Sequence, residues 1–449
     1  VSAGTAIAAG QTTTDGTVAI GSSALAALTS GAGNTALGYQ SLVASQAGGK
    51  NVAVGYQSLN NAAFDGTAAN TAVGYQAAAG LTSATGVTAI GYKAGGNAIM
   101  TGGDNTLIGR GAGYVLTGGD SNTIIGKDAG VSTTAGTNMV IIGKDAGAAA
   151  VTAAATGAVA IGHSALAALT SGVANVAIGY TSLLACSTSD YNTAVGHQAL
   201  QAVSTGDGVN TAVGRASGYA LSTGSANTYM GASSGFYNAT GDNNTYLGYG
   251  AGNGVTGNSN SNNTAVGASA LTANTTGGTN VAVGTNAMLA NTEGSNNVAV
   301  GHNAGAHITE GLGNVCIGVE AGDYGNDITT GNSNTLVGAY CSQTSATAND
   351  AHGFGYNLDA ETAYTTLGNG TADIRAAHGV VTWNTISDER VKKDITDSEA
   401  GLSFINALRP RTFKYKTLGE IPESFRAYEA DSTEVFKNTQ TNHGFIAQE

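Results

Sequence analysis

The sequence predicts an all-β fold, in which stacked β-coils form a solenoid shaft that is followed by a smaller α+β segment. Three observations predict this fold. A five-residue core of Asn, Thr or Val, Ala, an aliphatic residue and Gly recurs along most of the chain. Glycine supplies 69 of the 449 residues, whereas charged residues make up only 10%. No proline precedes Pro410, which suits a stacked sheet because such a sheet needs every backbone N–H.

The closing glycine of each repeat sets the size and number of the coils. From Gly21 to Gly355 these glycines are spaced 17 to 20 residues apart, most often 17. A constant period over most of a chain is typical of a solenoid, and here it predicts about twenty coils. At a strand spacing of about 4.8 Å, the shaft would extend on the order of 95 Å.

Each repeat also predicts the parts of its coil. Thr/Val and Val/Ile alternate around Ala, which indicates a β-strand with the branched face turned inward. The glycine follows where the chain bends or another backbone approaches closely. A polar or aromatic residue comes next, often Tyr, and then a small-plus-apolar pair such as Ser41-Leu42, for which we expect a second short strand. A polar turn closes the coil, and we expect the recurring Asn to stack as a ladder or to cap that turn.

The predicted core of a single coil is thin, because its inward residues are small. We therefore expect three chains to pack side by side and to share a core. The N-[TV]-A-[VI]-G units resemble the head repeats of trimeric autotransporter adhesins over roughly residues 15–360. This resemblance implies a homotrimer of left-handed β-rolls, although the repeats of those heads are usually shorter.

Composition and charge exclude several classes of function. The net charge of −13 disfavours nucleic-acid binding, because no basic stripe is available for phosphates. Cys186, Cys316 and Cys341 form no spaced cluster, so we expect small buried side chains and no disulfide framework or metal site. We expect no cofactor. The sequence has no transmembrane run and no signal peptide, and since it begins at Val1 we expect a missing N-terminal region.

The composition changes near residue 380. Residues 380–449 contain 9 of the 16 Lys and Arg residues, the only Trp (Trp383) and both prolines. A helix is predicted from Asp397 or Ser398 through about Leu408, before Pro410. A strand is predicted over 411–416, and another begins at His443.

Three segments at this end resemble the C-terminal intramolecular chaperone of phage tail spikes and tail fibres. They are WNTISDERVKKDI (383–395), LSFINALRPRTFKYK (402–416) and HGFIAQE (443–449). The resemblance implies a domain that trimerises, assists folding of the fibre and then cuts itself off with a Ser–Lys dyad. Carried over by motif, the nucleophile is Ser387, the base is Lys392 and the scissile bond is Ser387–Asp388. Asp388 and Arg390 also match the motif.

The chemistry of this dyad is plausible for a single turnover, since a desolvated lysine can activate a serine hydroxyl. The alternative is that Ser387 and Lys392 lie on a solvated turn, and the adjacent Lys393 competes for the role of base. The family continues beyond the length present here, so we expect a truncated domain. The predicted organisation is an upstream end (1–14), the shaft (15–360), a connector (361–386) and the first part of the chaperone (387–449).

Two further groups in the shaft are candidate sites. His163, His197 and His302 follow the repeat glycine, where Tyr is common; they are either polar surface residues or, in a trimer, rings able to bind a metal or an anion. The two GKDAG units place Lys127 over Lys144 and Asp128 over Asp145. Because stacked like charges repel, we expect diagonal Lys–Asp pairs and not a catalytic carboxylate pair.

Together these observations predict a structural attachment protein: a homotrimeric tail fibre of a virion that meets a glycan or protein receptor on the host surface. The missing N-terminus would dock to the virion. A trimeric adhesin on a bacterial cell surface is the alternative, with a cell-surface anchor in its place. A polysaccharide-degrading tail spike is disfavoured, because the repeats contain few acidic or aromatic clusters.

Overall fold

The computed structural model describes residues 15–64, 66–96, 98–370, 372–380, 384–385, 411–422, 428–435 and 442–444. The chain divides into two compact units, Val1–Ile386 and Ser387–Glu449. All regular structure in the described residues is β, so the predicted all-β solenoid is confirmed, whereas the α+β content of the C-terminal segment stays a prediction. None of the described segments forms a helix that is long and apolar enough to cross a bilayer.

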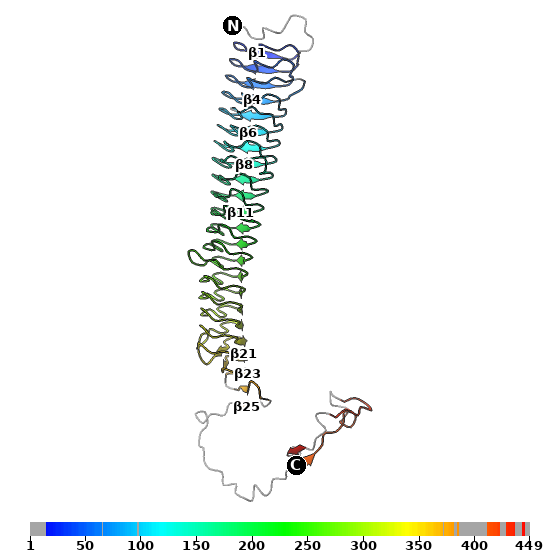
Figure 1. Cartoon of the computed structure of the whole chain (residues 1–449), viewed down its shortest axis with the longest axis vertical. Helices are drawn as coiled ribbons and strands as arrows, with labels where there is room; N and C mark the ends of the chain where they lie inside the picture. The colour runs from blue at the N-terminus through cyan, green and yellow to red at the C-terminus, as the bar shows by residue number, and fades with distance from the viewer. Residues whose placement is uncertain are drawn as a thin grey trace. The chain divides into compact units, whose positions relative to one another are not determined.

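The first unit is a β-solenoid in which each coil contributes one short strand to a continuous sheet (Figure 1). The strands of this unit are β1 (Val18–Ile20), β2 (Thr35–Leu37), β3 (Val52–Val54), β4 (Thr71–Val73), β5 (Thr88–Ile90), β6 (Thr106–Ile108), β7 (Thr123–Ile125), β8 (Val140–Ile142), β9 (Val159–Ile161), β10 (Val176–Ile178), β11 (Thr193–Val195), β12 (Thr211–Val213), β13 (Thr228–Met230), β14 (Thr245–Leu247), β15 (Thr264–Val266), β16 (Val281–Val283), β17 (Val298–Val300), β18 (Val315–Ile317), β19 (Thr335–Val337), β20 (Ser342–Gln343), β21 (His352–Tyr356), β22 (Asp359–Ala360), β23 (Tyr364–Asn369), β24 (Ile374–Ala377) and β25 (Asn384–Thr385).

Neighbouring coils pair in parallel and in register. Ala36 of β2 lies between Ala19 of β1 and Ala53 of β3, and the same relationship continues through β19, β21 and β23. The solenoid has about 21 coils. In the last of these, the glycine is Gly368 within β23, only 13 residues beyond Gly355, which is why the period of 17 to 20 residues predicts one coil fewer. β24 and β25 then pair antiparallel to end the sheet.

The predicted orientation of the strands is wrong. In β4 the central Ala72 is fully buried, whereas Thr71 and Val73 are only half-buried. Most of the other strands have the same pattern, with only the middle residue buried. A three-residue strand has a single residue on its inner face, and the narrow interior of the coil takes a small side chain there. The branched residues therefore form the outer face of the sheet.

The core of many coils contains a pair of residues of complementary size, six positions apart. Where the strand centre is Ala, as at Ala36 or Ala194, the residue six positions later is Leu42 or Leu200, and all four are fully buried. Where the centre is large, that position is Gly: a Cβ on Gly113 would lie 2.9 Å from Leu107 Cδ2. In these coils the summed volume of the pair is similar, as close packing favours; Ala89 and Gly95, by contrast, are both small.

The predicted second strand forms only near the C-terminal end of the described shaft, where β20 and β22 pair in parallel as a separate sheet; in the earlier coils a turn takes its place. Ser41 and Leu42 lie in a turn, in which Gln40 and Leu42 take left-handed φ values of 53° and 52°. These two residues reverse the chain direction and direct the Leu42 side chain into the core. The left-handed conformation costs roughly 1–2 kcal/mol for a residue other than glycine, which burial of the leucine offsets.

The closing glycines lie where the backbones of neighbouring coils touch. Gly109 has φ 130°, and a Cβ at this position would approach the carbonyl oxygen of Gly126 to 2.5 Å. Gly126 stands in the same relation to Gly143. The prediction of a close backbone approach is confirmed, and its repetition along the chain explains the spacing of these glycines.

The recurring asparagines form a buried ladder and also cap the turn, so both predicted roles are confirmed. Asn227 Oδ1 accepts a hydrogen bond from Asn244 N at 2.9 Å, and Asn227 Nδ2 donates to the carbonyl oxygen of Gly241 at 2.8 Å. Asn227 is 1% exposed. The ladder is interrupted where Val87, Met139 and Ala158 replace Asn. Because a buried amide must be hydrogen-bonded, this ladder fixes the register of the coils.

The three cysteines are free and buried, as predicted. Burial raises the pKa of Cys186 and of Cys316 to about 12. These thiols therefore pack as small apolar groups in the interior of the solenoid.

In the second unit, β26 (Arg411–Phe413) and β27 (Asn442–Gly444) pair antiparallel, with Thr412 beside His443. Strand structure is thus present within both stretches where the sequence predicts it. Two of the three segments that carry the chaperone resemblance are joined by this pairing. The predicted helix through Leu408 lies outside the described residues.

Candidate functional site

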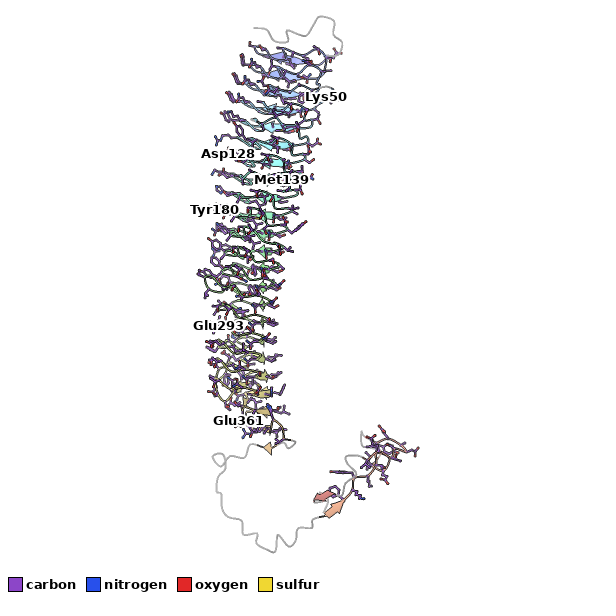
Figure 2. The ribbon with its side chains drawn as sticks, viewed as in Figure 1. Lys50, Asp128, Met139, Tyr180, Glu293 and Glu361 are labelled. Carbon is purple, nitrogen blue, oxygen red and sulfur yellow. The ribbon has the colours of Figure 1, made fainter. Side chains whose placement is uncertain are left out.

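The predicted catalytic residues Ser387 and Lys392, and the motif residues Asp388 and Arg390, lie outside the described residues. Their dyad therefore stays a prediction. The described part of the chain offers a different candidate, on the turn that follows the closing glycine of each coil. Asp128 and Tyr180 both belong to this turn and project from the same edge of the shaft (Figure 2).

Tyrosines in this turn stack into a ladder along the first coils. The rings of Tyr39, Tyr56, Tyr75 and Tyr92 follow one another with centroids 5.2, 5.1 and 5.3 Å apart. Each is between 42% and 49% exposed. The spacing is close to the strand spacing, because the same position in successive coils carries the ring.

A ladder of glutamine side chains accompanies the rings. Gln57 Nε2 donates to Gln40 Oε1 at 2.8 Å, and Gln76 Nε2 donates to Gln57 Oε1 at 2.9 Å. The next coil has Lys93 at this position, and the one after it has Gly111. The side chain that would continue the ladder is missing at Gly111.

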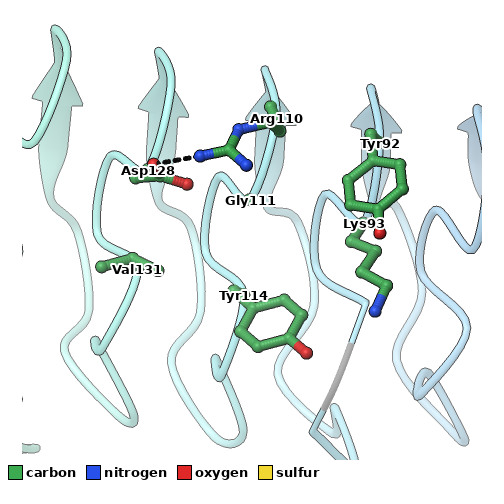
Figure 3. A pocket seen from close by; sticks show the side chains of 7 residues that line it. All are labelled: Tyr92, Lys93, Arg110, Gly111, Tyr114, Asp128 and Val131. Carbon is green, nitrogen blue, oxygen red and sulfur yellow. Dashed lines mark hydrogen bonds and ion pairs between the residues drawn. The ribbon is translucent and has the colours of Figure 1, made fainter.

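An open hollow of about 260 Å³ lies at this interruption (Figure 3). It spans three coils and is lined by Tyr92, Lys93, Arg110, Gly111, Tyr114, Asp128 and Val131. Gly111 has φ 66°, and a Cβ there would lie 2.7 Å from Asp128 Oδ1. A larger residue at this position would therefore fill the hollow.

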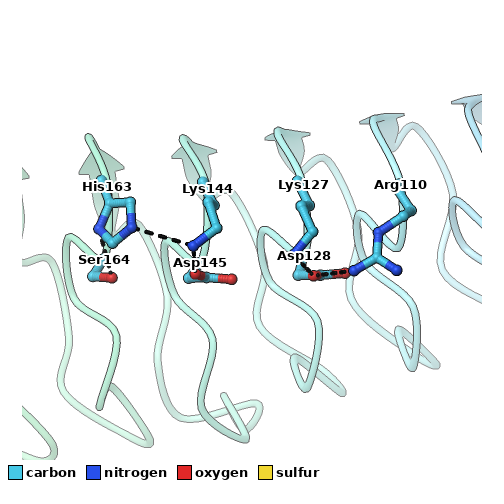
Figure 4. Close-up of polar contacts among 7 residues, drawn as sticks. All are labelled: Arg110, Lys127, Asp128, Lys144, Asp145, His163 and Ser164. Carbon is cyan, nitrogen blue, oxygen red and sulfur yellow. Dashed lines mark hydrogen bonds and ion pairs between the residues drawn. The ribbon is translucent and has the colours of Figure 1, made fainter.

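The polar groups of the hollow are arranged around Asp128 (Figure 4). Arg110 Nη2 and Lys127 Nζ each lie 2.8 Å from Asp128 Oδ2. The pKa of Asp128 is held below its usual range, mainly by the hydrogen bond from Lys127 and also by that from Arg110. Lys93 Nζ lies 5.6 Å from the ring centre of Tyr92 and 6.0 Å from that of Tyr114, within the range of a cation–π contact.

The predicted diagonal pairing of the GKDAG units is replaced by pairing within each unit. Lys127 pairs with Asp128, and Lys144 Nζ lies 2.7 Å from Asp145 Oδ2. The reason is local: Asp128 and Asp145 have φ values of 55° and 57°, and this left-handed turn brings each carboxylate back to the preceding lysine. The pair that crosses between coils comes from Arg110.

Two of the three histidines considered from the sequence take the place of a tyrosine in a second aromatic stack. The ring of Tyr180 lies 5.3 Å from that of His163 and 5.0 Å from that of His197. His163 also lies beside Lys144 and Ser164. This placement fits the interpretation of a surface substitution. Metal or anion binding by histidine rings in a trimer stays a prediction.

Sequence reasoning missed Lys93, Arg110, Gly111 and Tyr114. The sequence does contain a signal, because each of the first three replaces a Tyr or Gln that the preceding coils have at the same position. The hollow combines two aromatic rings, those of Tyr92 and Tyr114, with two cationic side chains and the carboxylate of Asp128. Such a set can stack on a sugar ring and hydrogen-bond its hydroxyl groups.

Comparison with known proteins finds a similarity in the second unit. Residues 387–449 match the family model described as "chaperone of endosialidase", a peptidase family. No curated protein and no solved structure gives a significant match. The match begins where the second compact unit begins. A β-solenoid shaft followed by a segment similar to this chaperone is the arrangement of a phage tail fibre or tail spike with a C-terminal chaperone domain.

Proposed function

We propose that this chain is the shaft and chaperone region of a trimeric tail fibre that attaches a virion to its host. The observation that carries the proposal is the chaperone-family match directly after a solenoid of in-register coils. A solenoid of this kind projects a surface far from its anchor. The chaperone would assist the slow pairing of non-local strands, which exposes aggregation-prone edges during folding.

The outer face of the sheet supports trimerisation. Along β1 to β19 its outward positions carry only Thr, Val, Ile, Leu or Met. Ile20, Leu37, Ile178, Met230 and Val300 are each between 36% and 57% exposed there. A continuous apolar face of this extent is typical of a protein–protein interface, and copies of the same chain would present the same face in the same register.

Native mass spectrometry and sedimentation of the purified chain test the assembly. We expect a homotrimer for the wild type and dissociation for Val300→Glu, which places a charge on the apolar face. Leu312→Glu is the matched control, since Leu312 is 48% exposed in a turn and not on the sheet. A wild-type monomer would contradict the proposal.

Self-processing rests on the motif match at Ser387 and Lys392 and on the peptidase family of the matched segment. Lys392 would take the proton of the Ser387 hydroxyl, and hydrolysis of the Ser387–Asp388 bond would consume one water. Release of the chaperone would leave the folded shaft kinetically trapped.

The test is the yield and the N-terminal sequence of the released fragment during expression of the full-length protein. Ser387→Ala and Lys392→Ala should abolish the fragment that begins at Asp388, and Lys393→Ala should not. Processing that persists in Ser387→Ala would remove the dyad from the proposal, whereas loss in Lys393→Ala alone would transfer the role of base to Lys393.

For host attachment we propose that the hollow around Gly111 contacts a surface glycan. Its two tyrosine rings and the Arg110–Asp128 pair support this role. Arg110→Ala and Tyr114→Ala should each weaken binding on a glycan array at least several-fold, since each removes a stacking or hydrogen-bonding group. Lys144→Ala, at the equivalent turn outside the hollow, should bind like the wild type. Equal binding by all three variants would exclude the hollow as the contact.

A further inference from the structure

One coil near the C-terminal end of the shaft contains an insertion. The glycines Gly284, Gly301 and Gly318 are 17 residues apart, but Gly338 follows after 20. The extra residues lie between Gly322 and Ile328, because Ile328 takes the buried position that Ile308 takes one coil earlier. Where the earlier coil has Ala306 and His307, this coil has the five residues 323–327. The insertion therefore lies opposite His307.

This insertion brings two carboxylates to one imidazole nitrogen. His307 Nδ1 is hydrogen-bonded to Asp323 Oδ1 and lies 3.2 Å from Asp327 Oδ2. One nitrogen and two oxygen atoms from these three residues all lie within 4.8 Å of one another. The Asp323 side chain is only 7% exposed, Asp327 is 34% exposed and His307 is 58% exposed. The cluster is thus anchored in the shaft on one side and accessible to solvent on the other.

The three atoms are close enough to converge on one metal ion, which would replace the hydrogen bond between His307 Nδ1 and Asp323 Oδ1. A transition-metal ion binds imidazole nitrogen and carboxylate oxygen at about 2.0–2.2 Å, so tetrahedral ligand atoms lie roughly 3.3–3.6 Å apart. The 3.2 Å separation of Nδ1 and Asp327 Oδ2 is near this range. The two carboxylates also create a negative potential beside the imidazole nitrogen, which favours a bound cation.

We propose that His307, Asp323 and Asp327 form a binding site for a divalent transition-metal ion, of which Zn²⁺ is the best candidate. The nitrogen ligand disfavours Ca²⁺ and Mg²⁺, which prefer oxygen. The ion would join the coil after β17 to the coil after β18 and leave a coordination position open to water. The repeat pattern alone predicts no metal, because these ligands appear only through the insertion and the alignment of two coils.

The experiment measures Zn²⁺ binding to the purified full-length protein after dialysis against a chelator. Isothermal titration or competition with a chromogenic chelator should give one site per chain. Zn²⁺ should raise the melting temperature, because the ion binds the folded shaft and not the unfolded chain. An excess of Ca²⁺ should not displace it.

Variants separate the site from adventitious binding. His307→Ala should abolish the site, and Asp327→Asn should weaken it by about 10–100-fold. His302→Ala is the matched control, since His302 is an exposed histidine of the same coil and should leave binding unchanged. Both site variants alter exposed or half-exposed side chains, so the shaft should still fold, as far-UV circular dichroism will show. Binding that persists in His307→Ala, binding lost in His302→Ala, equal competition by Ca²⁺ or no binding to the wild type would each overturn the proposal.

Discussion

The ring of Tyr229 occupies the space that a side chain on Gly235 would need: a Cβ on Gly235 would lie 2.8 Å from Tyr229 Cε1. Both residues belong to the size-matched pairs that fill the coils, and Asn238 Nδ2 donates a hydrogen bond to the Tyr229 hydroxyl at 3.1 Å. This pair allows the packing rule to be tested directly.

We expect Gly235→Leu to destabilise the shaft, because the new side chain would clash with the ring. Tyr229→Ala should also destabilise it, by about 3–5 kcal/mol, since it leaves a large cavity. The double variant should lose less stability than the sum of the two single losses, because it recreates the Ala194–Leu200 pair of an earlier coil. Thermal melting of the four proteins measures the coupling, and strict additivity would contradict the packing rule.

The asparagine ladder predicts a position-dependent cost for loss of an amide. Asn227→Ala should lower stability by about 1–3 kcal/mol, because it leaves the backbone N–H of Asn244 and the carbonyl of Gly241 without their buried partner. Asn349→Ala provides the control: Asn349 also bonds to the neighbouring coil, through Asn332, but it is exposed, and its loss should change stability by no more than about 0.5 kcal/mol. Equal melting temperatures for the two variants would show that burial of the ladder is irrelevant.

Proline in a strand should break the sheet. Val73→Pro removes a backbone N–H from β4, which has a neighbouring strand on each side, and should cost about 3 kcal/mol or more. Val73→Ile retains the N–H and matches Ile90 of the next coil, so its melting curve should resemble that of the wild type. A Val73→Pro variant that melts like the wild type would contradict the strand assignment.

The buried thiols should resist modification in the native protein. Because the pKa of both Cys186 and Cys316 is raised to about 12, little thiolate exists at pH 8, and neither sulfur is accessible. An aromatic disulfide reagent should therefore label no Cys186 or Cys316 until the chain is unfolded by denaturant. Rapid native labelling of Cys316 would indicate local opening of the coil around β18.

Much of the shaft could be predicted from its repeats, but not the orientation of its strands. Alternation of Thr71, Ala72 and Val73 indicates two faces without identifying the inner one, and the usual preference for buried branched residues gives the wrong answer in so narrow a coil. The inner face is revealed by residues six positions apart, not by the alternation within one strand. A large Tyr229 is followed six positions later by Gly235, whereas a small Ala194 is followed six positions later by Leu200. This compensation in size identifies the residues that share the interior.

The candidate sites were harder to predict because they arise from differences between coils. Gly111 looks like any other glycine of a glycine-rich chain, and only the stacking of Gln76, Lys93 and Asp128 around it reveals a missing side chain. His307 and Asp323 are 16 residues apart, which has meaning only once the coils are aligned. The proposed dyad of Ser387 and Lys392 is the reverse case, since a local motif predicts it without any knowledge of the shaft.

Because the coils pair in register, the length of the shaft can change only by whole coils. Coils along the shaft contact their neighbours through equivalent glycines, through equivalent strands and, in most cases, through equivalent asparagines. Removal of residues 264–280 would join Asn263 to Val281 and restore the motif N-V-A-V-G without a seam. Such a deletion would shorten the shaft by one strand spacing, about 4.8 Å, so duplication or loss of a single repeat can adjust the length of the shaft in steps that leave the fold unchanged.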